Sequence, residues 1–295
     1  MAEYIRYDSE YLSSQMENAL GRAMPGGELD LIKAPLYVSA ATYAAGAAVI
    51  HNGFLWINTS GTTTTGVEPG TNYNVWNVTY CNPNLLDNPY FPGPVNQRGV
   101  SGTISSTGYF IDRWKLTSGS VTLGSTGITL NGTIVQISET AWGTNVHASV
   151  IMVSGSATIS YNNTTKTTTI TSSGGVIQYA KLEIGSISTA ANDAPPDNAM
   201  VLSKCQRYYV DGSQLKFYSV SKTIEISGDY VFMIPVIFPT TMRTTPSLTT
   251  ALLWSYGCTG TATSDATKVG CTLKIYNSSE ALTGATVGIT ANAEL

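Results

Sequence analysis

Charged residues are scarce in this sequence, and their scarcity excludes one large class of partners. Only 12% of the 295 residues are Asp, Glu, Lys or Arg, against about a quarter in an average protein. The formal net charge is −4, and Lys and Arg never form a run. Because proteins bind the phosphates of DNA and RNA through clustered cations, we expect no nucleic-acid partner.

Long apolar runs, histidines and paired cysteines are also missing. No apolar run reaches the length of a membrane span, and the N-terminus lacks the pattern of a secretory signal, so we expect no membrane insertion. The two histidines and four cysteines form no closely spaced set, so we expect no metal and no cofactor. The missing secretory signal favours free, buried thiols. The alternative is a disulfide between Cys258 and Cys271.

The polar character comes instead from 40 threonines and 30 serines, accompanied by 28 glycines. Threonine fits the half-exposed surface of a strand and suits helices poorly. Since 42% of the residues are hydrophobic, the chain has the composition of a folded protein rather than a disordered one. The composition therefore predicts an all-β fold with tight turns.

Residues 1–33 carry the one convincing helical pattern. Asp8 is a candidate N-cap, and residues 25–27, Pro-Gly-Gly, end the segment. Apolar side chains repeat at coiled-coil spacing, at Ile5, Leu12, Met16, Ala19 and Ala23. Two interpretations stay open: a helix that lies on its own domain or docks elsewhere, and a short oligomerising stalk or anchor.

The rest of the chain divides into three β segments. Residues 34–83 predict a small β module, with a hairpin that turns at Asn52-Gly53. In the segment 84–190, residues 100–188 alternate on a two-residue period with about eight short strands and a turn at Asn131-Gly132, which indicates a β-sandwich or jelly roll. After a linker at 189–198, the segment 191–295 predicts a second β-sandwich.

Two stretches of the last segment do not follow plain alternation. Ala199 to Tyr209 predicts a short helix or the start of a strand. Phe232 to Phe238 is almost entirely apolar, which predicts burial on both faces or a contact between subunits.

The segment Asn84–Gly99, NLLDNPYFPGPVNQRG, predicts a rigid loop. Its prolines fix the backbone and prevent a helix. We expect its four large apolar side chains to seal one end of the sandwich, and Asp87 and Arg98 to hold the loop by hydrogen bonds. The apolar four are Leu85, Leu86, Tyr90 and Phe91.

Five motifs in a fixed order resemble a module family of bacteriophage and prophage tail-fibre-like proteins. They are the loop above, GYFIDRWK (108–115), AKLEIGSIST (180–189), KCQRYYV (204–210) and PVIFPTTMRTTP (235–246). The resemblance covers residues 84 to about 250, and nothing after Pro246 matches. It implies a jelly-roll, carbohydrate-binding-like domain followed by a smaller β domain, in a homotrimeric fibre.

Residues 40–80 are similar to small chitin-binding-type modules. The pattern is a hairpin followed by a downstream tryptophan. It is carried here by Tyr43, Gly46, Val49, Gly53, Trp56 and Trp76. This pattern is short and covers only the small module.

The sequence offers little for catalysis. Glycoside cleavage needs two facing carboxylates, and the acids of the middle segment are Asp87, Asp112, Glu139 and Glu183. We expect Asp112 and Arg113 to form a structural ion pair or backbone clamp, and Trp114 to lie in the core. No nucleophile motif accompanies either histidine, and no long repeat indicates a β-helix depolymerase, so we predict that the chain is not an enzyme.

Sugar binding requires only an exposed aromatic face and a few hydrogen-bonding groups. In the middle segment the candidates are Trp142, Asn145 and His147, in ETAWGTNVH. In the small module they are Trp56, Tyr73 and Trp76. The alternative for each tryptophan is a place in the core or at a subunit interface. Trp142 is the best candidate because Gly143, Thr144 and Asn145 flank it as loop residues.

The resemblance to phage fibre modules implies a virion protein, which we expect to be assembled as a homotrimer in the host cytoplasm. As a tail fibre or receptor-binding component it would attach to host cell-surface glycan, with the N-terminal segment bound to other virion proteins. The alternative is a capsid head fibre or decoration protein with a structural or loosely adhesive role, and a glycan depolymerase is the third hypothesis.

Overall fold

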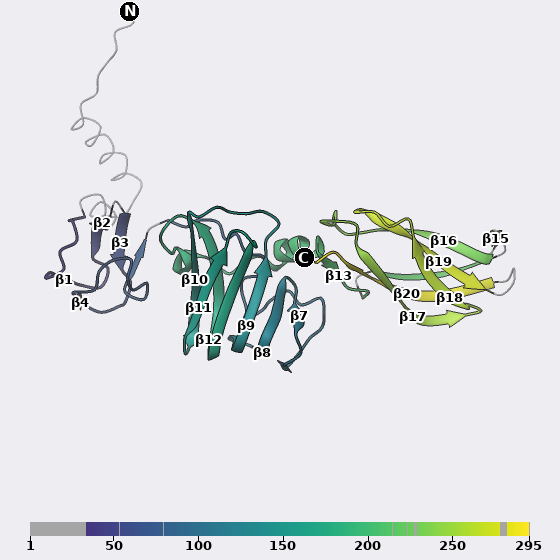
Figure 1. The fold of residues 1–295 in the computed structure, drawn as a ribbon, viewed down its shortest axis with the longest axis horizontal. Helices are drawn as coiled ribbons and strands as arrows, with labels where there is room; N and C mark the ends of the chain where they lie inside the picture. The colour runs from purple at the N-terminus through teal and green to yellow at the C-terminus, as the bar shows by residue number, and fades with distance from the viewer. Residues whose placement is uncertain are drawn as a thin grey trace, which may run out of the picture. The chain divides into compact units, whose positions relative to one another are not determined.

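A computed structural model describes residues 34–294, except residues 53, 79, 214, 223, 227–228 and 278–281. The helix expected in residues 1–33 lies outside the described residues. Strands make up most of the described chain (Figure 1), with one α-helix and one 3-10 helix among them. The prediction of an all-β fold is confirmed. None of the helices described is long and apolar enough to span a membrane.

The chain forms two compact units. The first combines the described residues up to Asn82 with residues 187–193, and the second combines residues 83–186 with residues 194–294. Each unit has its own buried apolar residues.

The first unit contains the small β module. Strands β2, β3 and β5 form one antiparallel sheet, and β1 pairs with β4. Its elements are β1 (Thr42–Tyr43), β2 (Ala48–His51), β3 (Phe54–Asn58), β4 (Thr64–Thr65), β5 (Trp76–Val78) and the 3-10 helix η1 (Ala190–Asn192). His51 pairs with Phe54 across the β2–β3 turn, where Asn52 takes a positive φ of 50°. The predicted hairpin is therefore present.

Seven strands of the second unit form one hydrogen-bonded sheet, which we call the seven-stranded domain (Figure 1). They are β6 (Thr103–Ile104), β7 (Gly108–Ile111), β8 (Trp114–Gly124), β9 (Gly127–Ile137), β10 (Val146–Ser154), β11 (Ala157–Asn162) and β12 (Thr167–Ile184). The long strand β12 connects the two parts of the sheet, because it pairs with β9 on one side and with β10 and β11 on the other.

The prediction of a turn at Asn131-Gly132 is wrong, because both residues lie inside β9. Gly132 has a φ of +143°, and a Cβ atom there would lie 2.1 Å from the carbonyl oxygen of Ser118. Gly119, on β8 opposite Gly132, has the same constraint, with 2.0 Å to the carbonyl oxygen of Asn131. Glycine serves here to let two strands approach closely.

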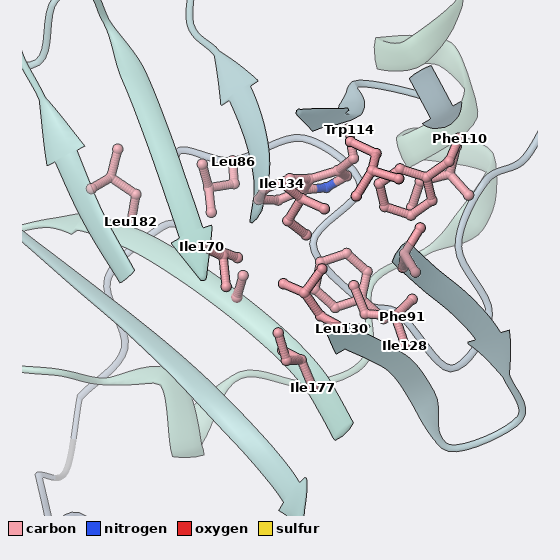
Figure 2. Close-up of a cluster of buried hydrophobic side chains, with 14 residues drawn as sticks. Leu86, Phe91, Phe110, Trp114, Ile128, Leu130, Ile134, Ile170, Ile177 and Leu182 are labelled. Atoms are coloured by element: carbon pink, nitrogen blue, oxygen red, sulfur yellow. The ribbon is translucent and has the colours of Figure 1, made fainter. Parts of the chain in front are cut away.

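The loop Asn84–Gly99 closes the core of the seven-stranded domain. It runs along β12, where the backbone N–H groups of Leu85 and Phe91 donate to Leu182 and Gln178. Leu86 and Phe91 are buried with the inward-facing residues of β7, β8, β9 and β12. Figure 2 shows both side chains among the isoleucines and leucines of those strands.

The rest of the second unit forms a sandwich of two four-stranded sheets, which we call the C-terminal sandwich. One sheet contains β13, β14, β17 and β20, and the other has the order β15-β16-β19-β18. The strands are β13 (Tyr209–Val210), β14 (Lys216–Lys222), β15 (Ile224–Ile226), β16 (Asp229–Ile237), β17 (Ser247–Tyr256), β18 (Gly260–Ser264), β19 (Gly270–Asn277) and β20 (Leu282–Asn292). Residues from both sheets share one core.

The helix α3 (Asn198–Gln206) precedes the C-terminal sandwich. The Asp197 carboxylate caps it by accepting a 2.8 Å hydrogen bond from the backbone N–H of Ala199. On β16, Phe232 and Val236 are buried while Met233 and Ile237 are exposed. This apolar stretch is therefore covered on one face only by the described chain.

Candidate ligand-binding site

The loop between β9 and β10, residues 138–145, borders two cavities of the second unit. The first, which we call the Trp142 cavity, has a volume of about 300 Å³. Its polar and aromatic lining includes Asp87, Glu139, Trp142, Lys204, Arg207 and Tyr208. The second, which we call the Tyr161 cavity, has a volume of about 530 Å³ and is lined by Thr144, Val146, Ala148, Tyr161 and Asn162 among others.

Hydrogen bonds from β11 and the turn after it hold the loop in place. The backbone N–H of Trp142 donates to the Tyr161 hydroxyl at 3.1 Å, and that of Gly143 donates to the Asn163 side chain at 2.8 Å. Gly143 has a φ of +83°, a conformation that glycine adopts readily. These contacts place the Trp142 ring partly against the core of the seven-stranded domain.

The indole nitrogen of Trp142 is buried and has no hydrogen-bond partner among the described residues. The other buried tryptophans differ, because each donates to a backbone carbonyl. Trp56 donates to His51 at 3.3 Å, Trp76 to Val67 at 2.7 Å and Trp114 to Asn88 at 2.9 Å. A buried N–H without an acceptor is costly, so a ligand acceptor that reached this N–H after a movement of the ring or the loop would bind favourably there.

Two carboxylates of the Trp142 cavity are held by cations. Glu139 accepts from Arg207 at 3.2 Å and from the Tyr208 hydroxyl at 2.6 Å. Burial raises the pKa of Tyr208, against an opposing effect of Arg113, so the phenol stays protonated and donates. Asp87 accepts from Arg113 Nε at 3.2 Å. Both acids are thus anchored acceptors, each already engaged with an arginine.

Asn145 and His147 do not join Trp142 around one cavity. Val146 and Ala148 pack toward the core, so His147 points to the other face of β10. There it lies opposite Glu183 in the β-ladder, and burial lowers its pKa while Glu183 opposes that shift. Asn145 is exposed, and its carbonyl accepts from the backbone N–H of Gly185 at 3.1 Å.

The candidates of the small module lie mainly in its core. Trp56 and Trp76 are 1% and 0% exposed, so neither ring offers a face to a ligand. Tyr73 is partly buried, with its ring centroid 6.2 Å from that of Trp56 and its hydroxyl accepting from the backbone N–H of Ser188. The alternative interpretation of these tryptophans, a structural one, fits their positions.

Arg113 is the centre of a buried ion network in the second unit. It donates to Asp87, to Glu294 Oε2 at 2.9 Å and to the carbonyl of Ile137 at 2.6 Å. Its guanidinium lies 3.5 Å from the ring centroid of Tyr208. Arg98 donates to the other carboxylate oxygen of Glu294 at 3.0 Å. This Arg113 network joins the seven-stranded domain to the end of the C-terminal sandwich.

Asp112 has no ion pair with Arg113 and clamps a backbone instead. Its carboxylate accepts from the backbone N–H of Gln97 at 2.6 Å and from the Gln97 side chain at 3.0 Å. Burial raises its pKa to about 6, against these hydrogen bonds. Trp114, the next residue but one, is fully buried in the core.

Sequence reasoning did not anticipate Lys204, Arg207 or Tyr208 as cavity residues. All three belong to the KCQRYYV motif, so the order of motifs was the signal available. Glu294 had no such signal, because it lies beyond Pro246, where the motif pattern ends. Glu183 is fully buried 3.8 Å from the Lys181 ammonium, so this acid does not reach either cavity.

The described residues contain no cluster of His, Cys, Asp and Glu side chains that could hold a metal ion. None of the four cysteines forms a disulfide with another described residue. Comparison with protein-family models, with curated proteins and with solved structures gives no match to this chain.

Proposed function

We propose that this chain is a bacteriophage virion fibre protein that attaches the particle to glycan on the host cell surface. The Trp142 cavity is the proposed sugar-binding site. The observation that carries the proposal is that Trp142 lines a polar cavity and that its indole N–H is buried without a partner among the described residues.

The lining of the cavity suits a sugar. An indole ring packs against the apolar face of a pyranose, and its N–H donates to a hydroxyl or ring oxygen. Glu139 and Asp87 supply acceptors fixed by arginines, while Lys204 and Arg207 supply donors. Because both carboxylates are engaged with arginines, the cavity supports binding rather than the acid–base chemistry of a glycosidase.

The resemblance to phage fibre modules supports the virion assignment. Its motifs contribute Asp87, Arg98, Arg113 and Tyr208 to one network, although they are far apart in the sequence. Residues that meet in this way form a single structural module. In the proposal the protein is a homotrimer, and residues 1–33 attach it to other virion proteins.

Glycan-array binding tests the proposed site. We predict that Trp142→Ala lowers affinity at least about tenfold for whichever arrayed bacterial glycan the full-length wild-type protein binds, since stacking and the indole hydrogen bond are both lost. Trp142→Phe should lose less, because it keeps a ring. Val153→Ala, at an exposed position of β10 away from both cavities, is the matched control and should bind as the wild type does.

Thermal melting of each variant checks that the comparison is made between folded proteins. Equal binding by wild type and Trp142→Ala would contradict the assignment of the site. Loss of binding in Val153→Ala would show that the assay reports folding rather than the cavity.

A further inference from the structure

Strand β17, Ser247–Tyr256, is an edge strand with an unusual sequence. It pairs with β20 on one side, and on its other side it forms no ladder with any described residue (Figure 1). Its ten residues, SLTTALLWSY, include no charge and no proline. The opposite edge of the same sheet, β14, begins and ends with lysine, at Lys216 and Lys222.

Proteins commonly protect a sheet edge from other chains with charged residues, prolines or a covering segment. The β14 edge begins with an exposed lysine, Lys216, and β17 has no charged residue. A long, uncharged edge strand presents unpaired backbone groups to any strand that approaches. This difference within one sheet distinguishes β17 as a surface for another polypeptide.

The large apolar side chains in the second half of β17 are exposed. Leu252, Leu253, Trp254 and Tyr256 are 44%, 53%, 48% and 62% exposed. The ladder with β20 is irregular between Leu252 and Trp254, and a bulge of this kind turns neighbouring side chains to different faces. Apolar groups therefore project from both faces of the strand.

An aromatic pair continues this surface across the sheet. Tyr218 on β14 and Trp254 both lie opposite Thr286 of β20, and their ring centroids are 5.8 Å apart at 39°. Tyr218 is itself 69% exposed. We call the five side chains of Tyr218, Leu252, Leu253, Trp254 and Tyr256 the β17 surface.

The size of the β17 surface fits a protein interface. Three aromatics and two leucines at about half exposure leave roughly 500 Å² of apolar area open, given the area that such side chains carry. A stable interface covers about 800 Å² on each partner, with an apolar core and a polar rim. The threonines and serines of β17 would supply part of that rim.

We propose that a second copy of this chain covers the β17 surface. A sugar would use the flat faces of Tyr218 and Trp254 but would leave Leu252, Leu253 and the free strand edge uncovered. An identical chain brings an equally neutral, apolar surface. The inference rests on the homotrimer of the proposed function and names the surface through which its copies meet, whereas the glycan site is independent of it.

Hydrogen exchange and sedimentation of the purified full-length protein test the proposal. Leu253→Asp places a charge at the centre of the β17 surface, and Val269→Asp places one at a similarly exposed position of the same sandwich outside that surface. We expect the wild type and Val269→Asp to self-associate with slow exchange at residues 247–256. Leu253→Asp should associate at least about tenfold more weakly, with fast exchange there.

Tyr218→Ser is a second variant, chosen because it removes an exposed ring without adding charge, and it should weaken association in the same direction. Three results would overturn the proposal. One is a wild-type monomer at every concentration, and another is equal exchange at residues 247–256 in all proteins, even if they associate elsewhere. The third is a monomer whose Trp254 is shielded from acrylamide only by an added neutral glycan.

Discussion

Glu294 shows how one carboxylate can tie distant parts of the chain together. It accepts from Arg98 and Arg113, whose positions in the sequence are almost two hundred residues earlier. Its side chain is 4% exposed and that of Arg113 is 1% exposed. Removing one member of a buried ion network leaves the others without a counter-charge, which costs more than the pair contributes.

We therefore predict that Glu294→Gln lowers the free energy of unfolding by about 3 kcal/mol, measured by urea denaturation. Glu68→Gln is the control, since Glu68 pairs with His51 at an exposed position, and it should change stability by less than about 0.5 kcal/mol. A Glu294→Gln protein as stable as the control would contradict the structural role of the network.

Asp112 predicts a dependence of stability on pH. Its pKa is about 6 in the folded protein against an ordinary value of 3.8, because it is buried. The folded state therefore binds more protons than the unfolded state between these two values. By linkage, this group destabilises the fold at neutral pH and the effect disappears as the pH falls toward 4.

For this group alone, lowering the pH from 7 to 4 should raise the free energy of unfolding by up to about 3 kcal/mol. The contribution is the difference between the pH profiles of wild type and Asp112→Asn, both measured by urea denaturation. Parallel profiles would show that the folded-state pKa of Asp112 is not raised.

Among the elements, β8 and β9 pair side by side at a point where both carry glycine. Gly132→Ala would place a Cβ atom 2.1 Å from the Ser118 carbonyl oxygen, at a φ that alanine avoids. We predict a loss of at least about 2 kcal/mol in unfolding free energy, measured by thermal or urea denaturation. Gly93→Ala, where a Cβ meets nothing within 4 Å, should be close to neutral, and equal effects would contradict the close approach.

Features set by neighbouring residues in the sequence could be predicted, and features set by residues far apart could not. Alternation along a strand is local, so the all-β fold and the Asn52 turn could be predicted. The rule that Asn-Gly marks a turn failed at Asn131-Gly132, because the glycine there is required by the close approach of strand β8. Glu294 could not be predicted, since no local pattern links it to Arg98 or Arg113.

The candidate site was predictable only in part for the same reason. Trp142 could be selected from its glycine- and asparagine-rich loop. Lys204, Arg207 and Tyr208 reach the cavity through the path of the chain from the seven-stranded domain into α3 and β13. The strand pattern around the tryptophans of the small module fits an exposed sugar-binding ring and a buried core ring equally well. Only the packing of the folded module shows that Trp56 and Trp76 are buried.

At the scale of the whole molecule, the two proposals assign different tasks to different parts of the second unit. The Trp142 cavity would bind glycan, while the β17 surface would bring copies together. Several weak sugar contacts on one particle strengthen attachment without any new contact. A protein defective at the β17 surface should therefore keep the affinity of its single site but bind an immobilised glycan less tightly.

The most direct test of the glycan site observes the tryptophan indole N–H groups by nuclear magnetic resonance. The glycan selected by the array would be titrated into the full-length protein labelled with nitrogen-15. The account predicts that the Trp142 indole resonance shifts on binding, while those of Trp56, Trp76 and Trp114, already bonded to carbonyls, stay in place. An unchanged Trp142 resonance at saturation, with or without a shift of Trp254, would contradict it.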